Sequence, residues 1–584
     1  MREAIYTAIE VALEELGITD APFVVERPSD FSHGDYSTNA ALAGYRFAAV
    51  AFNASVPTEK SPALNLFLPD GSISRNPREL AESLQKKLEN KIDGVVKVET
   101  ASPGFINFFL SREAIVKEID KIAQGEFSRA PSEFVGQTVM VEYTQPNPFK
   151  PFHIGHLMSN TYGESLVRLL GDAGAKVIPV NYQGDVGLHI AKALWGLQHK
   201  GYNAEDVGHI GEAYVLGHTA YEEDSEAKKE IMVINKQVYA GDPAILPLYK
   251  RGREVTLAHF EDLYQVLGTK FEKYFFESEV WKMGEQLVRE GTEKGIFKES
   301  DGAIIFPGED FGLHTRVFIT REGLPTYEAK DLGLAMAKLA YAPFDLSITT
   351  TAVEQGEYFK VVFEALAQLR PELRGKFIRV THGLLHLTTG KMSSRKGNVI
   401  TGESLIMDLK NVAKEKMQER NLTDPDKTAE HIAVGAIKYA VLKQGSSKDI
   451  SFDPEKSLSL EGDSGPYLQY ARVRACSLLK KAQKAGIDDL ARDKKNIDTF
   501  ISNLTLDRTL IHFTEVVERA TTELEPHHLT TYLTELAAAF NSWYANVPVI
   551  GGDYPHYALK LAKAFEKTMA KGLDLLGIPA PEEM

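Results

Sequence analysis

The chain has 584 residues, of which 43% are hydrophobic and 25% are charged. These proportions are ordinary for a globular protein and exclude a collagen-like, disordered or disulfide-dense chain. With 66 Lys and Arg against 81 Asp and Glu, the formal net charge is −15, so binding to nucleic acid requires local basic patches. The single cysteine, Cys476, excludes an intramolecular disulfide and a zinc site built from two or more thiolates. We see neither a signal peptide nor an apolar run of about 18 residues, and we expect a cytoplasmic protein.

The first 112 residues or so predict a small mixed α/β domain. A helix over residues 4–16 precedes a strand-like run at 23–28. Two alternating apolar runs, at 94–100 and 104–111, predict a hairpin that turns around residues 101–104. A charged helix over residues 111–125 then leads into the next region.

A different pattern begins near residue 136. A short apolar strand (138–144), a loop with three prolines, a helix (156–171) and a second strand (176–182) follow in that order. This βαβ order implies a parallel sheet that binds ligands at the carboxyl ends of its strands. Residues 200–300 look helical and charged, strands return between 302 and 350 around a helix at 330–341, and the chain is helical after residue 456.

The first motif with chemical meaning is His153-Ile154-Gly155-His156, at the point where the first strand gives way to its helix. A helix N-terminus offers unpaired N–H groups and partial positive charge. Gly155 lets a flat group approach the backbone. The pattern predicts a nucleotide site whose imidazoles donate to phosphate oxygens. Two ordinary loop histidines are the alternative.

The second motif is a Gly/Ser/Lys loop, KMSSRKGN, over residues 391–398. Positioned Lys and Arg side chains stabilise charge on a transferring phosphoryl group. A solvated basic loop is the alternative interpretation. The presence of the histidine motif in the same chain favours the phosphate-binding interpretation.

These two motifs are the HIGH and KMSKS signatures of class I aminoacyl-tRNA synthetases, and the chain resembles the arginyl-tRNA synthetase family. The specific resemblance lies in VEYTQPNPFKPFHIGHLMSN and LPTYEAKDLGLAMAK. The stretches NYQGDVGLHI, AVEQGEYFK, SGPYLQYARVRA and KGLDLLGIPAPEEM extend it. HGDYSTNAAL and SPGFINFFLS resemble the family's extra N-terminal domain, so the match runs almost end to end.

The resemblance implies a multidomain fold with α/β and all-α parts. We expect a small α/β N-terminal domain over residues 1–125 and a Rossmann-type parallel-sheet catalytic domain over 136–400, with a helical insertion at about 200–300. A linker that contacts the tRNA stem would occupy residues 401–455. A helical anticodon-binding bundle would occupy residues 456–584.

The family's reaction has two steps. Arginine attacks the α-phosphate of ATP, giving arginyl-adenylate and pyrophosphate, and the arginyl group then passes to the 2′-hydroxyl of the terminal adenosine of tRNA(Arg). Catalysis is positioning plus charge stabilisation, without a covalent enzyme intermediate. The family also implies magnesium with ATP, no zinc, a monomer, and bound tRNA for the first step.

An arginine pocket should contain carboxylates, because a guanidinium prefers them in a bidentate geometry. By resemblance, Glu142 and Asp331 hold the guanidinium together with Tyr327. Asn147 and Gln355 match positions that hold the α-amino and carboxylate end. A surface acid for Glu142, a helix N-terminal acid for Asp331 and core packing for Tyr327 are the ordinary alternatives.

The ATP site implied by the resemblance draws on both motifs and on the turn after the second strand. Its residues are His153, Gly155, His156, Gly184, Asp185, Lys391, Met392, Ser393, Ser394 and Lys396. Where the fourth KMSKS position is a lysine that stabilises pyrophosphate, this chain has Ser394. The family commonly compensates with a lysine just before HIGH, and Lys150 stands there. The groups expected to act in catalysis are therefore His153, His156, Lys150 and Lys391.

Candidate tRNA contacts come from basic stretches accompanied by aromatic residues, which suit the stacking of unpaired bases. In the last helix, lysines at 560, 563, 567 and 571 share one face. A solvated face and aromatic core packing are the alternatives. With the family's geometry added, we expect tRNA contacts at Asn107, Phe109, Tyr467, Tyr470, Arg472, Tyr544 and Met584.

Three rival functions are weaker. The cysteine, methionine and leucine synthetases do not need two acids in the pocket, and the first often uses zinc thiolates. A small adenylyltransferase with HIGH lacks a basic bundle and is far shorter. A non-catalytic tRNA-binding paralogue would not need an intact His153, His156 and Lys391.

Overall fold

The computed structural model describes residues 1–55, 66–67, 73–127, 132–388, 401–417, 422–487, 493 and 505–584. These form two compact units. The smaller unit comprises Met1–Ala130, Ala475–Glu515 and Glu535–Thr568, and the larger comprises Pro131–Arg474, Val516–Thr534 and Met569–Met584. In the described part of the chain, no helix is long and apolar enough to cross a membrane.

The smaller unit is built on a four-stranded antiparallel sheet in the order β1-β2-β6-β5. Its strands are β1 (Val25–Glu26), β2 (Tyr36–Thr38), β5 (Val95–Ala101) and β6 (Phe105–Leu110). The expected hairpin is confirmed, with Ala101 opposite Phe105. The helices of this region are α1 (Arg2–Glu15), α2 (Ala40–Ser55), α3 (Pro77–Leu88) and α4 (Arg112–Gln124), and β3 (Leu66–Phe67) pairs with β4 (Ile73–Ser74).

Two buried ion pairs join α17 (Thr505–Leu510) to this N-terminal fold. Arg112 lies 2.5 Å from the buried carboxylate of Asp507, and Arg508 lies 2.7 Å from that of Asp35. Removing one member of such a pair leaves an uncompensated buried charge, which is strongly destabilising. A segment from the C-terminal third therefore belongs to the N-terminal domain's own packing.

The larger unit contains a five-stranded, entirely parallel sheet in the order β14-β13-β7-β8-β9. The strands are β7 (Thr138–Glu142), β8 (Lys176–Gln183), β9 (Lys273–Phe276), β13 (Leu346–Ala352) and β14 (Phe377–His382). The chain builds outward from β7 to β8 and β9, then returns to the other side of β7 with β13 and β14. A switch point therefore lies between β7 and β13, where such folds bind ligands.

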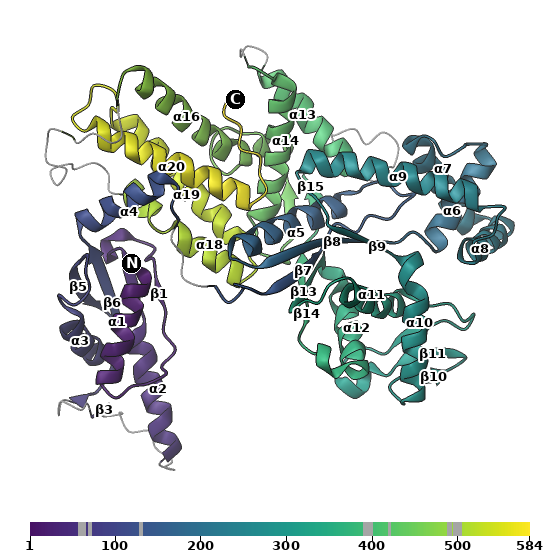
Figure 1. Ribbon diagram of the computed structural model, residues 1–584, viewed down its shortest axis with the longest axis horizontal. Coiled ribbons are helices and arrows are strands. Elements are labelled where there is room, and N and C mark those ends of the chain that lie inside the picture. Colours follow the sequence, from purple (N-terminus) through teal and green to yellow (C-terminus); the bar gives the residue numbers. More distant parts are fainter. Residues whose placement is uncertain are drawn as a thin grey trace. The chain divides into compact units, whose positions relative to one another are not determined.

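Helices cover both faces of this sheet (Figure 1). Helix α5 (Ile154–Asp172) connects β7 to β8 and packs on β7, β8 and β13, as the predicted βαβ unit requires. On the other face, Met140, Ile178 and Val180 pack against α10 (Glu277–Glu293) and α11 (Tyr327–Tyr341). These residues alternate along their strands, so each strand buries one set of side chains under each helical layer.

The expected helical insertion is present between β8 and β9. Its helices are α6 (Leu188–Lys200), α7 (Val207–Glu223), α8 (Ser225–Ala240) and α9 (Leu246–Leu267), which share their own apolar cluster (Figure 1). The runs expected as strands after residue 302 divide between two sheets. A small antiparallel sheet holds β10 (Lys298–Ser300), β11 (Ala303–Phe306) and β12 (Arg316–Ile319), because the connections between them are too short for parallel crossovers.

The C-terminal part is helical, as predicted. After β15 (Leu385–Leu387) come α13 (Gly402–Met417), α14 (Pro425–Leu442), β16 (Ile450–Phe452) and α15 (Pro454–Ser457). The last helices are α16 (Gly465–Lys484), α17, α18 (Phe513–Thr522), α19 (His527–Asn546) and α20 (Pro555–Leu575).

Within the larger unit, two cations join the C-terminal ends of α9 and α20. Arg168 donates to the Gly268 carbonyl oxygen (3.1 Å) and to Asp574 Oδ1 (2.7 Å). The buried Lys438 ammonium donates to the carbonyl oxygens of Leu267 (2.6 Å) and Gly577 (2.8 Å). Helix C-termini carry partial negative charge, so two cations there stabilise their close approach.

Candidate functional site

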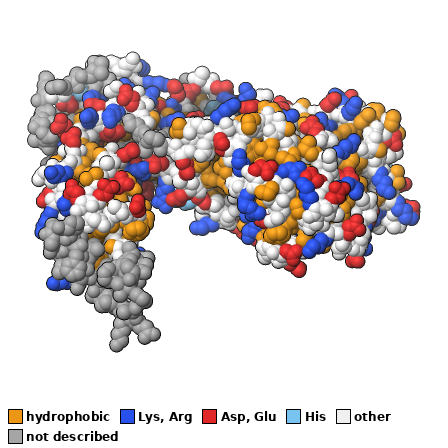
Figure 2. Space-filling model, turned by 60° about the horizontal axis from the view of Figure 1, so that its bottom comes forward, with side chains coloured by type: hydrophobic (Ala, Val, Ile, Leu, Met, Phe, Trp, Pro, Cys, Tyr) orange, Lys and Arg blue, Asp and Glu red, His pale blue; other side chains and the backbone are white. Residues whose placement is uncertain are grey.

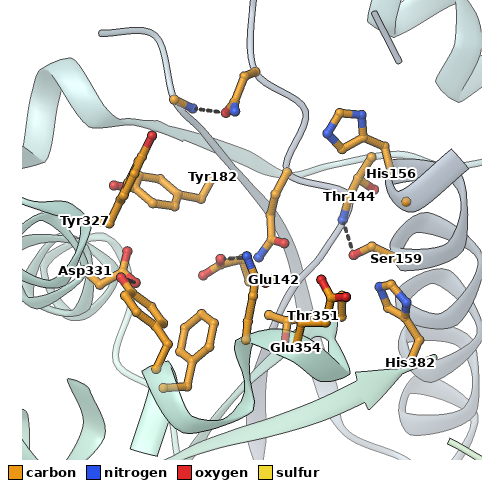
Figure 3. Close-up of a pocket in the computed structure, with 18 of the residues that line it drawn as sticks. Glu142, Thr144, His156, Ser159, Tyr182, Tyr327, Asp331, Thr351, Glu354 and His382 are labelled. Atoms are coloured by element: carbon orange, nitrogen blue, oxygen red, sulfur yellow. Dashed lines mark hydrogen bonds between the residues drawn. The ribbon is translucent and has the colours of Figure 1, made fainter. Parts of the chain in front are cut away.

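A cavity of about 600 Å³ opens at the carboxyl ends of β7, β8, β13 and β14, beside the sheet's switch point (Figure 3). Helix α5 points its N-terminus at this cavity, and α10, α11 and α12 (Gly356–Leu369) close the other side. The lining residues are Glu142, Thr144, Gln145, Asn147, His153, Gly155, His156, Ser159, Tyr182, Gly184, Glu277, Tyr327, Asp331, Thr351, Ala352, Glu354, Gln355, Tyr358, Phe359 and His382.

The two motif histidines form the start of α5. The backbone N–H of His153 donates to Nδ1 of His156 (3.2 Å), and the two rings stack with centroids 3.5 Å apart. Since Nδ1 of His156 accepts, its neutral ring carries the proton on Nε2. Burial lowers the pKa of both histidines, aided by the nearby Lys150 charge, so both are neutral near pH 7. A Cβ at Gly155 would lie 3.0 Å from the His153 ring, which explains the glycine.

The two carboxylates expected to bind a guanidinium both line this cavity (Figure 3). Glu142 is buried and accepts from Gln145 Nε2 at 2.6 Å, while Lys338 pairs with its other oxygen at 2.5 Å. Asp331 accepts a 2.6 Å hydrogen bond from the Tyr358 hydroxyl. Burial, above all, raises the pKa of Asp331 to about 8, and the charge of Glu142 adds to the effect.

The other predicted arginine-site residues line the same cavity. The Asn147 side-chain oxygen accepts from the backbone N–H of Gly184 at 3.0 Å, so Gly184 holds Asn147 in place. Tyr327 starts α11 with an exposed side chain, and Gln355 lies in the turn before α12. Residues from four separate segments thus meet around one space.

Asp185 stands apart from the cavity lining. Its carboxylate accepts from Ser278 through both the backbone N–H (2.9 Å) and Oγ (2.8 Å), from Arg253 Nε (3.0 Å) and from the Tyr249 hydroxyl (3.3 Å). Both oxygens are therefore engaged by protein groups. The carboxylate shapes the turn that presents Gly184, and it directs no free oxygen at the cavity.

Residues that sequence reasoning did not single out also contribute. The Tyr182 hydroxyl is buried and has no hydrogen-bond partner among the described residues, beside both carboxylates. Glu277 lines the cavity and pairs with Lys330 at 2.6 Å, both being buried. Lys338 lies seven residues after Asp331 on α11, two turns along the same face of the helix. Its position inside the apolar run LGLAMAKLA is the sequence feature that could have identified it as a buried lysine.

The second motif lies outside the described residues. That applies to Lys391, Met392, Ser393, Ser394 and Lys396. In the part of the chain that is described, no three His, Cys, Asp or Glu side chains gather as a metal site.

The expected tRNA contacts fall in both units. In the smaller unit, Asn107 is buried and accepts from Ser37 Oγ (2.9 Å), Phe109 lies under the Lys97 ammonium (4.8 Å to the ring centroid), and Tyr544 is exposed. In the larger unit, Tyr467 and Tyr470 are half-buried and Met584 is buried. The Arg472 guanidinium donates to the carbonyl oxygens of Ala580 and Pro581, so it anchors the C-terminal tail.

The lysine stripe of α20 is partly neutralised. Lys560 pairs with Asp120 at 2.8 Å in the smaller unit, and Lys571 pairs with Asp172 at 2.6 Å in the larger. On the face shown in Figure 2, Lys and Arg side chains are interspersed with Asp and Glu. The stripe is therefore not a uniformly free basic surface.

Three family models match successive parts of the chain. Residues 3–110 match the arginyl tRNA synthetase N-terminal domain, residues 122–454 the catalytic domain of class I (R) tRNA synthetases, and residues 468–584 the DALR anticodon-binding domain. The arginine–tRNA ligase of Treponema denticola is 31% identical over 89% of this chain and 92% of its own length. That of Exiguobacterium sibiricum is 31% identical over 88% and 91%. The Thermus thermophilus arginyl-tRNA synthetase structure superposes with a TM-score of 0.80, 26% identity and full coverage of both chains.

Proposed function

The chain belongs to the arginyl-tRNA synthetase family, and we propose that the cavity described above is where it joins L-arginine to tRNA(Arg) at the expense of ATP. The observation that supports the proposal most is the meeting of Glu142 and Asp331 in one cavity with the histidines of α5. Two acids suit a cationic side chain, whereas an apolar amino acid would leave them unpaired.

The guanidinium end of arginine binds between Glu142 and Asp331. Glu142 already pairs with Lys338, which fixes the orientation of its carboxylate. Asp331 gives up its proton when a guanidinium arrives, because an adjacent cation favours the charged form. Tyr182 offers a further oxygen to the guanidinium. Asn147 and Gln355 hold the α-amino and carboxylate end, and Tyr327 covers the ligand.

ATP binds over the N-terminus of α5. Gly155 leaves room for the nucleotide, and the neutral His156 donates from Nε2 to an oxygen of the ATP. The helix N-terminus contributes its partial positive charge to the same phosphates. His153 supports the His156 ring by stacking and adds a second donor.

The first step joins an arginine carboxylate oxygen to the α-phosphorus as pyrophosphate leaves. The charge that develops on pyrophosphate is met by Lys150 and by Lys391, with Lys150 supplying the cation that Ser394 lacks. In the second step, the 2′-hydroxyl of the terminal adenosine attacks the activated carbonyl, and AMP leaves. The protein's contribution is to position the reactants and to place donors where charge appears.

The proposal extends to the partners. The helical C-terminal part, of which residues 468–584 match the DALR domain, binds the anticodon region of tRNA(Arg). Its contacts are Tyr467, Tyr470, Tyr544 and Met584, and Arg472 acts by holding the tail that ends at Met584. Asn107 and Phe109 contact the tRNA from the N-terminal domain. ATP enters with magnesium, the enzyme works as a cytoplasmic monomer, and arginine activation needs bound tRNA.

Exchange of pyrophosphate into ATP tests the proposal directly. Each of the twenty amino acids is assayed with and without tRNA(Arg). We expect exchange with arginine only, and only when tRNA is present. Exchange with another amino acid would refute the arginine pocket. Binding of tRNA(Arg) without any exchange would identify a non-catalytic tRNA-binding protein.

A further inference from the structure

The loop that precedes the histidine motif is fixed to the helical insertion. Phe149 adopts a left-handed backbone conformation (φ +66°) and is fully buried among residues of α6, α7, α8 and α9. Gly252 on α9 leaves the space its ring fills, since a Cβ there would lie 2.3 Å from that ring. A non-glycine residue held in this region indicates that the surroundings over-determine the loop. The backbone of the next residue, Lys150, is therefore anchored to the insertion.

The Lys150 side chain also meets the insertion. Its ammonium nitrogen lies 5.3 Å from the ring centroid of Tyr214, a half-buried residue of α7. Within the described residues, this ammonium makes no hydrogen bond or ion pair. Two other lysines of this region differ, because Lys330 pairs with Glu277 at 2.6 Å and Lys192 with Glu222 at 3.2 Å.

Glu277 lies near enough to act on the Lys150 charge, but among the described residues no carboxylate pairs directly with this ammonium. A carboxylate would compete with phosphate oxygens for the ammonium hydrogens and cancel its charge. An aromatic face attracts the cation through the ring quadrupole and leaves its N–H groups available. Such a contact holds a lysine in place while keeping it able to receive a leaving group that gains negative charge.

From this geometry we propose that Tyr214 is a positioning residue, whose ring holds the Lys150 ammonium for pyrophosphate departure. The inference rests on the proposed role of Lys150. It assigns the helical insertion, which contains α7 and α9 (Figure 1), a part in arginine activation. Helix α7 supplies the ring, and α9 packs against the loop. Tyr214 acts through Lys150 and needs no contact with substrate.

Two substitutions separate the ring face from the hydroxyl. Tyr214→Leu removes the aromatic face, whereas Tyr214→Phe keeps it. With arginine and tRNA(Arg) present, we expect Tyr214→Leu to slow ATP–pyrophosphate exchange about three- to tenfold, the usual strength of a partly buried cation–π contact. The apparent KM for pyrophosphate should rise and the KM for arginine should not change. Tyr214→Phe should stay within twofold of the wild type.

The matched control is Tyr221→Leu, which removes a ring from the same helix, 4.2 Å from the Lys192 ammonium. It reports general damage to α7, and we expect its exchange rate to equal that of the wild type. If Tyr221→Leu and Tyr214→Leu slow exchange equally, or if Tyr214→Phe is as slow as Tyr214→Leu, the positioning role is refuted.

The Lys150→Ala background distinguishes the two levels of the inference. In that background we expect Tyr214→Leu to have no further effect. If Lys150→Ala alone stays within about threefold of the wild type, the role of Lys150 fails and the role of Tyr214 falls with it. If Lys150→Ala is slow but Tyr214→Leu lowers the rate equally in both backgrounds, only the positioning role is refuted.

Discussion

Arginine affinity should depend on pH through Asp331. Its side chain lies in the cavity under a hydrogen bond from Tyr358, and burial raises its pKa to about 8 in the free protein. A guanidinium pairs with the carboxylate and not with the neutral acid. Binding therefore requires a form that is scarce at neutral pH, and each binding event releases a proton.

The size of the effect follows from the ionised fraction. With a pKa of about 8, that fraction is roughly one hundredth at pH 6, one tenth at pH 7 and one half at pH 8. The apparent Kd varies inversely with the population of the competent form. It should therefore fall about fiftyfold from pH 6 to pH 8, equivalent to about 2.3 kcal/mol. Burial lowers the pKa of each motif histidine below its ordinary value, which moves the titration of both away from the pH 7–8 part of this range.

Isothermal titration of arginine into the full chain measures this effect, with tRNA(Arg) bound throughout. Two buffers with different ionisation enthalpies report the proton count, and we expect close to one proton released at pH 7. Tyr358→Phe removes the hydrogen bond that favours the carboxylate, so it should move the midpoint to higher pH. Asp331→Asn should bind weakly and without pH dependence. A Kd that stays constant from pH 6 to pH 8 would show that Asp331 is already ionised, and the reasoning would fail.

Four further substitutions test the site. Lys150→Ala should cost roughly 2–4 kcal/mol of transition-state stabilisation, the range for one oriented donor, and an adenylation rate within about threefold of the wild type would contradict its role. Lys338→Met and Glu142→Gln should each destabilise the protein by about 3–5 kcal/mol, because each leaves a buried charge unpaired. Measured by urea unfolding, the double variant should lose less stability than the two single variants lose together. Strictly additive losses would argue against an ion pair between Lys338 and Glu142. Tyr182→Phe should raise the KM for arginine about tenfold, as expected for the loss of a hydrogen bond to a charged group, and should leave the KM for ATP unchanged. The Tm should not fall, because the hydroxyl has no hydrogen-bond partner among the described residues. An unchanged KM for arginine would remove Tyr182 from the site.

Local periodicity predicted most of the elements of the fold. The alternating runs near residues 94–111 form the β5–β6 hairpin, and the strand–helix–strand order from residue 138 forms β7, α5 and β8. Both patterns depend on neighbours in sequence, so a single chain suffices to read them. The division of the later strands between two sheets depends on connections and packing, and periodicity did not separate β11 and β12 from the parallel sheet.

The candidate site also divides into features that the sequence predicted and features that only the structure shows. Residue types and motif flanks were enough to nominate Glu142, Asn147, Tyr327, Asp331 and Gln355, and all five line one cavity. Sequence alone did not show that Asp185 has both oxygens engaged by Ser278, Arg253 and Tyr249, because hydrogen-bond saturation is set by partners far along the chain.

The sequence by itself determined the order of helices and strands, the two motifs and the chemical types of the pocket residues, because these depend on side-chain identity and short-range spacing. Only the tertiary structure decided how charges combine. It paired Lys338 with Glu142, left Lys150 beside an aromatic ring, and enclosed Asp331 so that its pKa rises to about 8. Pairing and desolvation arise where distant segments pack together, and they set the charge each group presents to its substrate.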